Sequence, residues 1–441
     1  MDSEQEVVAR IKKIIIHDPE YWDFKEESTK KHIHNLINYP ATMVPVMQSE
    51  IIKLFKAYDS SINSVLDPFM GSGTTLIESN INGLDAVGID INPFAYLIVL
   101  VKTSLVDMQV YDEICMKLEK SLKEETEYSI HYFNKIDKWF KPDVIDKLSK
   151  IRTEIKKIDN VLYRRVFWIV FSKTVQESSN DRSSTFKLHA KAEIDIEKFN
   201  PDVIKIFITN MKRVKDAFNE YYSEYYNNSN NNIFCGDSIE ILQTKFEEKS
   251  QDLIVTSPPY GDNGTTVTYG QFSSLQLRWI DLDDIGCEIN SSLMSSYSAI
   301  DSKSLGGCKY TQDRIIESGI LNRSQTLSNI YNLLSKSDFF KARKVASFYI
   351  DYEKSLHEIF RVLKDQKCAV FTVGNRKVDG REVKLDDVTI ELVSFINVQL
   401  VYKFTRKIKN KRMPGKVSRL KNKKPVSSMK EETVLILKKM G

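Results

Sequence analysis

Short runs of apolar and β-branched residues recur along the chain and predict strands. They are residues 64–69, 85–91, 232–236, 252–255, 368–373, 398–407 and 431–438. Helical spacing follows the first run at residues 74–82 and precedes a later one at residues 352–363. This alternation of strand and helix predicts an α/β fold on a mainly parallel, doubly wound sheet.

Two stretches interrupt this rhythm. From Leu105 to about Asn230, Lys, Glu, Ile and Leu recur at helical spacing with few strand signals, and an Asn-rich run closes the stretch. We expect a helical insertion followed by a linker. The second stretch, from Asp281 to about Lys344, mixes Ser, Gly and charged residues without a clear period.

Length and composition limit the class of protein. A chain of 441 residues predicts two domains, or one large core with an insertion. No run approaches the ~20 apolar residues of a membrane span, and the N-terminal stretch lacks the apolar core of a signal peptide. We therefore expect a cytoplasmic protein with no membrane contact.

Cysteine and histidine spacing predicts no metal site. The cysteines show no CxxC or Cys/His spacing and are expected to be reduced; they are Cys115, Cys235, Cys287, Cys308 and Cys368. Five histidines belong to no recognisable group and are interpreted as surface or packing residues: His17, His32, His131, His189 and His357.

Positive charge is concentrated near the C-terminus. Twelve of the 64 Lys and Arg residues lie between Lys403 and Lys430, a segment without acidic residues. The rest of the chain carries 52 basic against 60 acidic residues, a net charge of −8. A basic segment on an acidic protein indicates phosphate-backbone binding, although such runs are often only solvated loops.

A glycine turn follows the first predicted strand. Asp67 ends that strand, and Gly71-Ser72-Gly73 opens the next helix, where small residues let a ligand approach the backbone. Asp90 ends the second strand, at the place where an acid accepts ribose hydroxyls. The lysine of a phosphate loop is missing, which disfavours an NTPase. An acid at the first strand's end suits a cationic nucleoside such as S-adenosylmethionine.

A Ser-Pro-Pro-Tyr unit follows the strand at residues 252–255. The Ser257 hydroxyl and the Pro258 carbonyl can accept hydrogen bonds from one amino group, and Tyr260 can stack on a flat ring, which is worth ~1–3 kcal/mol for a base. A base in a duplex would have to be flipped out to enter this pocket. No cysteine follows a proline, so methylation of a ring carbon through a cysteine is not expected.

With these motifs the chain resembles the amino-methylating DNA methyltransferases, which modify cytosine N4 or adenine N6. The resemblance covers about residues 31–106 and 232–441 and implies a Rossmann-like sheet of order 3-2-1-4-5-7-6, with strand 7 antiparallel. It implies these contacts to S-adenosylmethionine: Tyr39, Thr42, Asp67, Phe69, Gly71, Ser72, Gly73, Thr74, Thr75, Asp90, Ile91, Asp237 and Ser238. It makes Ser257, Pro258, Pro259 and Tyr260 the catalytic unit.

The resemblance also implies double-stranded DNA as the substrate. The expected contacts are Asn263, Thr265, Tyr269, Lys407, Lys409, Lys411 and Arg412. Such enzymes are commonly paired in function with a restriction endonuclease, without implied contact between the two proteins.

The resemblance divides the chain into five parts. Residues 1–104 hold the N-terminal region and the cofactor part, 232–280 the catalytic part, and 346–441 the end of the sheet with its basic loop. Residues 105–231 and 281–345 are insertions, either or both of which can carry target recognition.

Ser257 in the first position of its motif favours cytosine N4 over adenine N6. Two other hypotheses stay open. One is an enzyme that acts on RNA or on a protein amide; the other is a DNA-binding protein that has lost catalysis.

Overall fold

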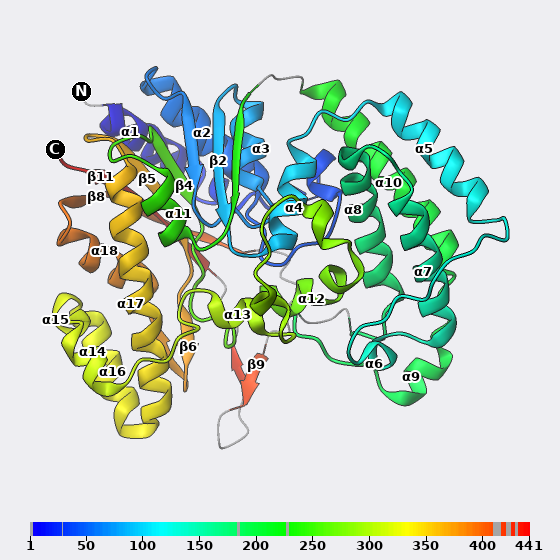
Figure 1. The fold of residues 1–441 in the computed structure, drawn as a ribbon. Helices are drawn as coiled ribbons and strands as arrows, with labels where there is room; N and C mark the ends of the chain where they lie inside the picture. The colour runs from blue at the N-terminus through cyan, green and yellow to red at the C-terminus, as the bar shows by residue number, and fades with distance from the viewer. Residues whose placement is uncertain are drawn as a thin grey trace.

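The computed structural model describes residues 3–28, 30–182, 186–225, 229–408, 416–419, 425–427 and 431–441. At its centre is a seven-stranded sheet of order β3-β2-β1-β4-β5-β11-β8 (Figure 1). The strands are β1 (Ser64–Asp67), β2 (Asp85–Asp90), β3 (Asn231–Cys235), β4 (Leu253–Thr256), β5 (Cys368–Val373), β8 (Val398–Lys407) and β11 (Glu431–Lys439). β11 runs antiparallel to both its neighbours, and the other pairs are parallel. The predicted α/β fold, strand order and antiparallel strand are confirmed.

The central strands β1, β4 and β5 consist mainly of buried apolar residues, as expected for a sheet that is covered on both faces. In β4, Leu253 and Val255 face a cluster that includes α1 (Ser3–His17) and α2 (Pro45–Tyr58). The intervening Ile254 faces the opposite cluster, formed with α11 (Ser238–Lys245), α17 (Phe339–Val362) and α18 (Leu385–Ser394). Side chains that alternate across a strand therefore build two separate layers of core.

The stretch after the second strand is helical, as expected. Its helices are α5 (Met108–Ser121), α6 (Ile136–Trp139), α7 (Pro142–Lys156), α8 (Val161–Ser178), α9 (Glu193–Lys198) and α10 (Val203–Glu224). All of them except α9, which has no buried residue, share one apolar core with α4 (Pro93–Lys102) and α12 (Tyr269–Trp279). In this core Trp279 lies edge-on to Phe140 and Phe171. The insertion is thus packed onto the sheet domain, on the right in Figure 1. The five-part division of the chain stays a prediction.

The second interruption is also largely helical. Short 3-10 turns η3 (Leu282–Ile285) and η4 (Ser291–Met294) lead into α13 (Ala299–Lys303), α14 (Gln312–Glu317), α15 (Ile320–Arg323) and α16 (Gln325–Ser337). The last three pack on α17, at the lower left of Figure 1. α17 begins at Phe339, well before the predicted start at residue 352. The buried face of its first half includes small and aromatic residues such as Ala342, Ala346 and Tyr349. The helical spacing of large aliphatic residues is therefore not visible in this part of the sequence.

The remaining elements are short. They are η1 (Tyr21–Asp23), η2 (His32–Asn35), α3 (Thr74–Ile81), the hairpin β6 (Arg376–Val378) and β7 (Arg381–Val383), and the pair β9 (Lys416–Arg419) and β10 (Pro425–Ser427). Among them, α3 packs on the central strands β1 and β2. Among the described residues, none of the helices is both long and apolar enough to cross a bilayer.

Candidate active site

The predicted site residues converge where β1, β2 and β4 end. Asp67, Asp90 and Thr256 are the last residues of these strands. The β1–β4 pair marks the reversal of strand order, the place where open α/β sheets bind ligands.

Asp67 is fully buried and joins two of the strands. Its Oδ1 accepts hydrogen bonds from the Thr256 hydroxyl at 2.6 Å and from the Phe69 N–H at 3.1 Å. Within the described part of the chain, its Oδ2 is buried without a partner at hydrogen-bond distance. Burial raises the pKa of Asp67 to about 6, although the nearby Thr75 hydroxyl acts in the opposite direction. The site therefore holds a buried acidic oxygen that is open to a donor or a cation.

The glycine turn lies against Asp90. Gly71 and Gly73 have φ of 49° and 78°, in the left-handed region that favours glycine. The Gly71 N–H donates to Asp90 Oδ2 at 2.9 Å, and the Asn92 N–H donates to Oδ1 at 2.8 Å. Burial and the neighbouring Asp67 raise the pKa of Asp90 to about 6. A Cβ on Gly73 would lie 2.7 Å from Val99 Cγ2, so close packing also requires glycine there.

Tyr39 lies over the turn. A Cβ on Gly71 would be 3.6 Å from Tyr39 Cε1. The Asn92 amide donates to Tyr39 Oη at 3.1 Å and to Ser273 Oγ at 2.8 Å. Tyr39 also stacks on Tyr269, with ring centroids 5.9 Å apart. Tyr39 and the start of α12 therefore meet beside the turn.

The other predicted cofactor contacts differ in how far they are buried. Ser72, Thr74 and Thr75 are buried at the start of α3, whereas Thr42 is exposed. Phe69 and Ile91 are half-buried and pack against the cores. Their roles remain predictions.

Asp237 follows β3 and caps a helix. Its Oδ1 accepts from the N–H groups of Ile239 at 2.8 Å and Glu240 at 3.3 Å, with Ser238 as the first residue of α11. The preceding Gly236 N–H donates to the Asp90 carbonyl at 2.9 Å. Asp237 therefore stands beside the end of β2, and the structure adds a capping role that the sequence did not indicate. Its predicted contact with the cofactor stays a prediction.

The Ser-Pro-Pro-Tyr unit leaves β4 next to Asp67, and its polar groups form a chain. Tyr260 donates to Glu432 Oε1 at 3.1 Å, and Arg406 donates to Glu432 Oε2 at 3.1 Å. The Ser257 and Tyr260 oxygens are 3.2 Å apart. Because the Tyr260 proton is directed to Glu432, the Ser257 hydroxyl donates to Tyr260. The lone pairs of Ser257 then remain available to accept hydrogen bonds.

Sequence reasoning missed Glu432 and Arg406. They face each other on β11 and β8: Arg406 lies within the basic segment, and Glu432 follows just after it. The only signal was the acidic pair Glu431-Glu432, which opens a strand directly after a run without acids. Burial, with Glu432 beside it, holds the pKa of Tyr260 well above its usual range.

Two of the loop residues predicted to contact DNA, Asn263 and Thr265, form hydrogen bonds with other residues of the protein. The buried Asn263 donates to Asp301 Oδ1 at 3.2 Å. Thr265 donates to Asp262 Oδ2 at 2.5 Å and accepts from Arg376 at 2.7 Å. These bonds hold the loop after Tyr260 against α13 and β6.

The predicted basic contacts are only partly described. Lys407 is exposed, and its side-chain Nζ lies 3.5 Å from Glu20 Oε1. The backbone N–H of Lys407 donates to Asp23 Oδ1 at 2.7 Å. Lys409, Lys411 and Arg412 lie outside the described residues.

The chain is similar in sequence to known DNA methylases. A family model described as a DNA methylase matches residues 10–101. Type II methyltransferase M.MvaI of Kocuria varians is 35% identical over 432 residues, which cover 95% of this chain and 93% of that protein. Type II methyltransferase M.BsoBI of Geobacillus stearothermophilus is 20% identical, over 91% of this chain and 86% of its own length. Type II methyltransferase M.MjaII of Methanocaldococcus jannaschii is 27% identical, over 45% and 32%. The chain belongs to the amino-methylating family of DNA methyltransferases found in restriction–modification systems.

Proposed function

We propose that the chain methylates cytosine N4 in double-stranded DNA, with S-adenosylmethionine as the methyl donor. The cofactor, when bound, supplies an electrophilic methyl group on a sulfonium. The residues at the ends of β1 and β2 fit its chemistry. Asp67 offers a cationic ligand a buried carboxylate oxygen that has no hydrogen-bond partner among the described residues. Asp90 retains lone pairs for ribose hydroxyls. The glycine turn between them leaves room for a ligand beside the backbone.

The Ser-Pro-Pro-Tyr unit is the main support for an amino group as the acceptor of the methyl group. Its first residue, Ser257, follows Thr256, which is hydrogen-bonded to Asp67. Glu432 fixes the Tyr260 proton and thereby keeps the Ser257 oxygen an acceptor. Ser257 and the Pro258 carbonyl can then hold the two hydrogens of an amino group and turn its lone pair toward the donor. This chemistry needs positioning and electrostatics but no covalent enzyme intermediate.

The target base leaves the duplex in this proposal, because a stacked base cannot reach the carboxyl ends of the strands. Target recognition is assigned to the helical insertions, and backbone contact to the basic segment between β8 and β11. The enzyme protects DNA from a restriction endonuclease that shares its recognition sequence.

The alternative is methylation of adenine N6 by the same site. It differs only in the ring that enters the pocket, and Ser257 in first position favours cytosine. A further alternative, an RNA substrate, has no specific observation in its favour.

Product analysis tests the proposal. The protein is incubated with unmethylated DNA of high sequence diversity and labelled S-adenosylmethionine, and the digested nucleosides are separated. N4-methylcytosine is the expected product. N6-methyladenine would overturn the base assignment, and absence of label despite cofactor binding would overturn the proposed DNA activity.

A further inference from the structure

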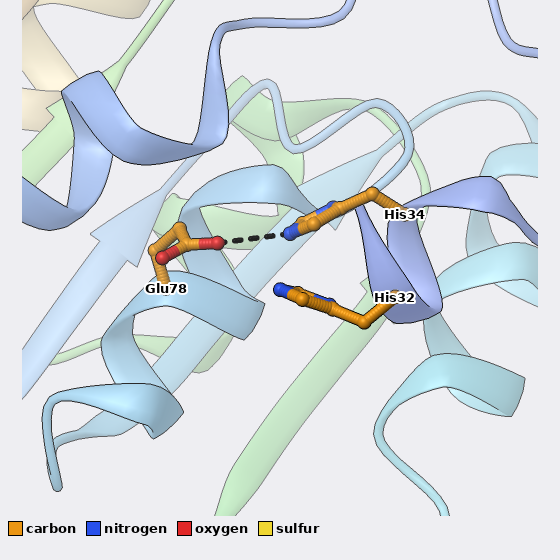
Figure 2. A group of neighbouring side chains, drawn as sticks. All are labelled: His32, His34 and Glu78. Carbon is orange, nitrogen blue, oxygen red and sulfur yellow. Dashed lines mark hydrogen bonds and ion pairs between the residues drawn. The ribbon is translucent and has the colours of Figure 1, made fainter. Parts of the chain in front are cut away.

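A buried cluster outside the proposed methyl-transfer site contains two imidazoles and a carboxylate. His32 and His34 belong to η2, and Glu78 to α3. One ligand atom from each of the three side chains lies within 4.8 Å of the other two. Figure 2 shows that both rings point a nitrogen toward the Glu78 carboxylate. All three side chains are buried.

Hydrogen bonding within the protein satisfies this cluster only in part. His34 Nε2 and Glu78 Oε1 are 2.9 Å apart. In the described structure, His32 Nδ1 is buried without a hydrogen-bond partner. His32 also has a φ of 38°, in the left-handed region that is costly for a residue other than glycine. Burying an unpaired polar nitrogen costs free energy, which a ligand bound at this cluster would offset.

Lys102, a buried basic side chain on α4, interacts electrostatically with His34 and Glu78. Its Nζ donates a hydrogen bond to the Ser72 carbonyl at 2.8 Å.

We propose that His32, His34 and Glu78 bind one divalent transition-metal ion of the zinc type. Two nitrogens and one oxygen form a donor set typical of Zn²⁺, with a fourth position left for water, whereas Mg²⁺ and Ca²⁺ prefer oxygen alone. Ligand atoms around tetrahedral zinc are about 3.3–3.6 Å apart. His34 Nε2 and Glu78 Oε1, which are 2.9 Å apart, would therefore separate slightly as the ion enters, and the other ligand atoms already lie within 4.8 Å. This proposal replaces the expectation of no metal site, which treated His32 as a packing residue.

The site would hold three parts of the chain together. η2 lies upstream of Tyr39, α3 is opened by the glycine turn, and the Tyr221 ring of α10 lies 5.6 Å from the His32 ring. The metal would therefore stabilise the junction between the cofactor turn and the helical insertion, without taking part in methyl transfer.

Metal binding by the full-length protein tests the proposal. Protein stripped with a chelator is dialysed and titrated with Zn²⁺ against a chromogenic chelator, and Co²⁺ is added separately for its visible spectrum. We expect about one Zn²⁺ per chain, a Co²⁺ spectrum of low coordination number, and a higher midpoint of thermal unfolding with Zn²⁺ but not with Mg²⁺. His32→Gln and Glu78→Gln should each weaken Zn²⁺ binding at least tenfold, whereas the exposed-site control His189→Gln should not.

Two results would overturn the proposal. One is Zn²⁺ binding that is equal in the wild type, His32→Gln and His189→Gln, which would place the ion on surface residues. The other is a six-coordinate Co²⁺ spectrum in the wild type, a measurement that does not depend on whether the variants fold. Neither readout involves DNA methylation.

Discussion

Thr256 donates a hydrogen bond of 2.6 Å to Asp67, across the neighbouring strands β4 and β1. The residue before the Ser-Pro-Pro-Tyr unit is thereby bound to the acid that ends the first strand. A buried hydrogen bond to a charged group contributes about 1.5–3 kcal/mol. It fixes the spacing between the proposed cofactor site and the proposed base pocket.

Asp67→Ala should abolish cofactor binding, and Asp67→Asn should weaken it about ten- to hundredfold, because the asparagine keeps the shape but removes the charge. Isothermal titration with S-adenosylmethionine measures the effect. Asp85→Asn, at the opposite end of β2, is the matched control and should leave the affinity unchanged. Equal losses in the two Asn variants would contradict the role of Asp67.

Cofactor affinity should fall in acid. The pKa values of Asp67 and Asp90 are both about 6 in the free protein. A cationic ligand favours their ionised forms, so affinity is complete well above pH 6 and declines as pH falls through about 6. Titrations between about pH 5 and pH 8 measure this. The affinity for S-adenosylhomocysteine, which lacks the sulfonium charge, should decline less steeply with falling pH. Identical pH profiles of affinity for the two ligands would contradict a role of the carboxylate charge in binding the sulfonium.

Tyr260→Ala should reduce methyl transfer far more than cofactor binding, because the ring is proposed to stack on the base, a contact worth ~1–3 kcal/mol. Single-turnover rates and cofactor affinity, measured on the same preparation, separate the two effects. An equal loss of both would show that Tyr260 supports the cofactor instead.

Glu432→Gln should slow transfer without changing cofactor affinity. Glutamine can donate to Tyr260, which frees the Tyr260 proton to turn toward Ser257 and occupy its acceptor oxygen. Tyr260→Phe in the Glu432→Gln background should add little, since both changes act through one chain of hydrogen bonds. Additive losses would mean that Glu432 acts independently.

Gly73→Ala should destabilise the turn by about 1–3 kcal/mol, because it combines a left-handed φ with a Cβ contact of 2.7 Å to Val99. Gly264→Ala is the control, because a Cβ on Gly264 would lie 3.5 Å from Asp262 Oδ1 and Lys344 Nζ, an ordinary contact distance. Chemical denaturation curves give both values. Similar stability of the two variants would indicate that the turn relaxes.

Neutralising Lys409, Lys411 and Arg412 together should weaken DNA binding and lower its salt dependence by roughly 0.9 per lost phosphate contact. Binding to one duplex, measured over a range of salt concentrations, gives the slope. An unchanged slope would exclude this segment from the DNA interface.

The sequence determined the sheet and its two motifs by itself. Short apolar runs ending in Asp67, Asp90 and Thr256 can be identified locally, because a strand covered on both faces must be apolar and a turn at its end requires small or rigid residues. The helical character of the first insertion could also be predicted from the helical spacing of its apolar residues. The start of α17 could not be predicted in this way, because the buried face there includes small and aromatic residues.

Only the tertiary structure decided which distant side chains meet. Glu432 reaches Tyr260 because β11 returns antiparallel beside β5, 172 residues further along the chain. His34 reaches Glu78 from 44 residues away, through a turn in which His32 adopts a left-handed backbone. Such contacts depend on packing between elements that have no fixed spacing in sequence, and local patterns therefore do not contain them.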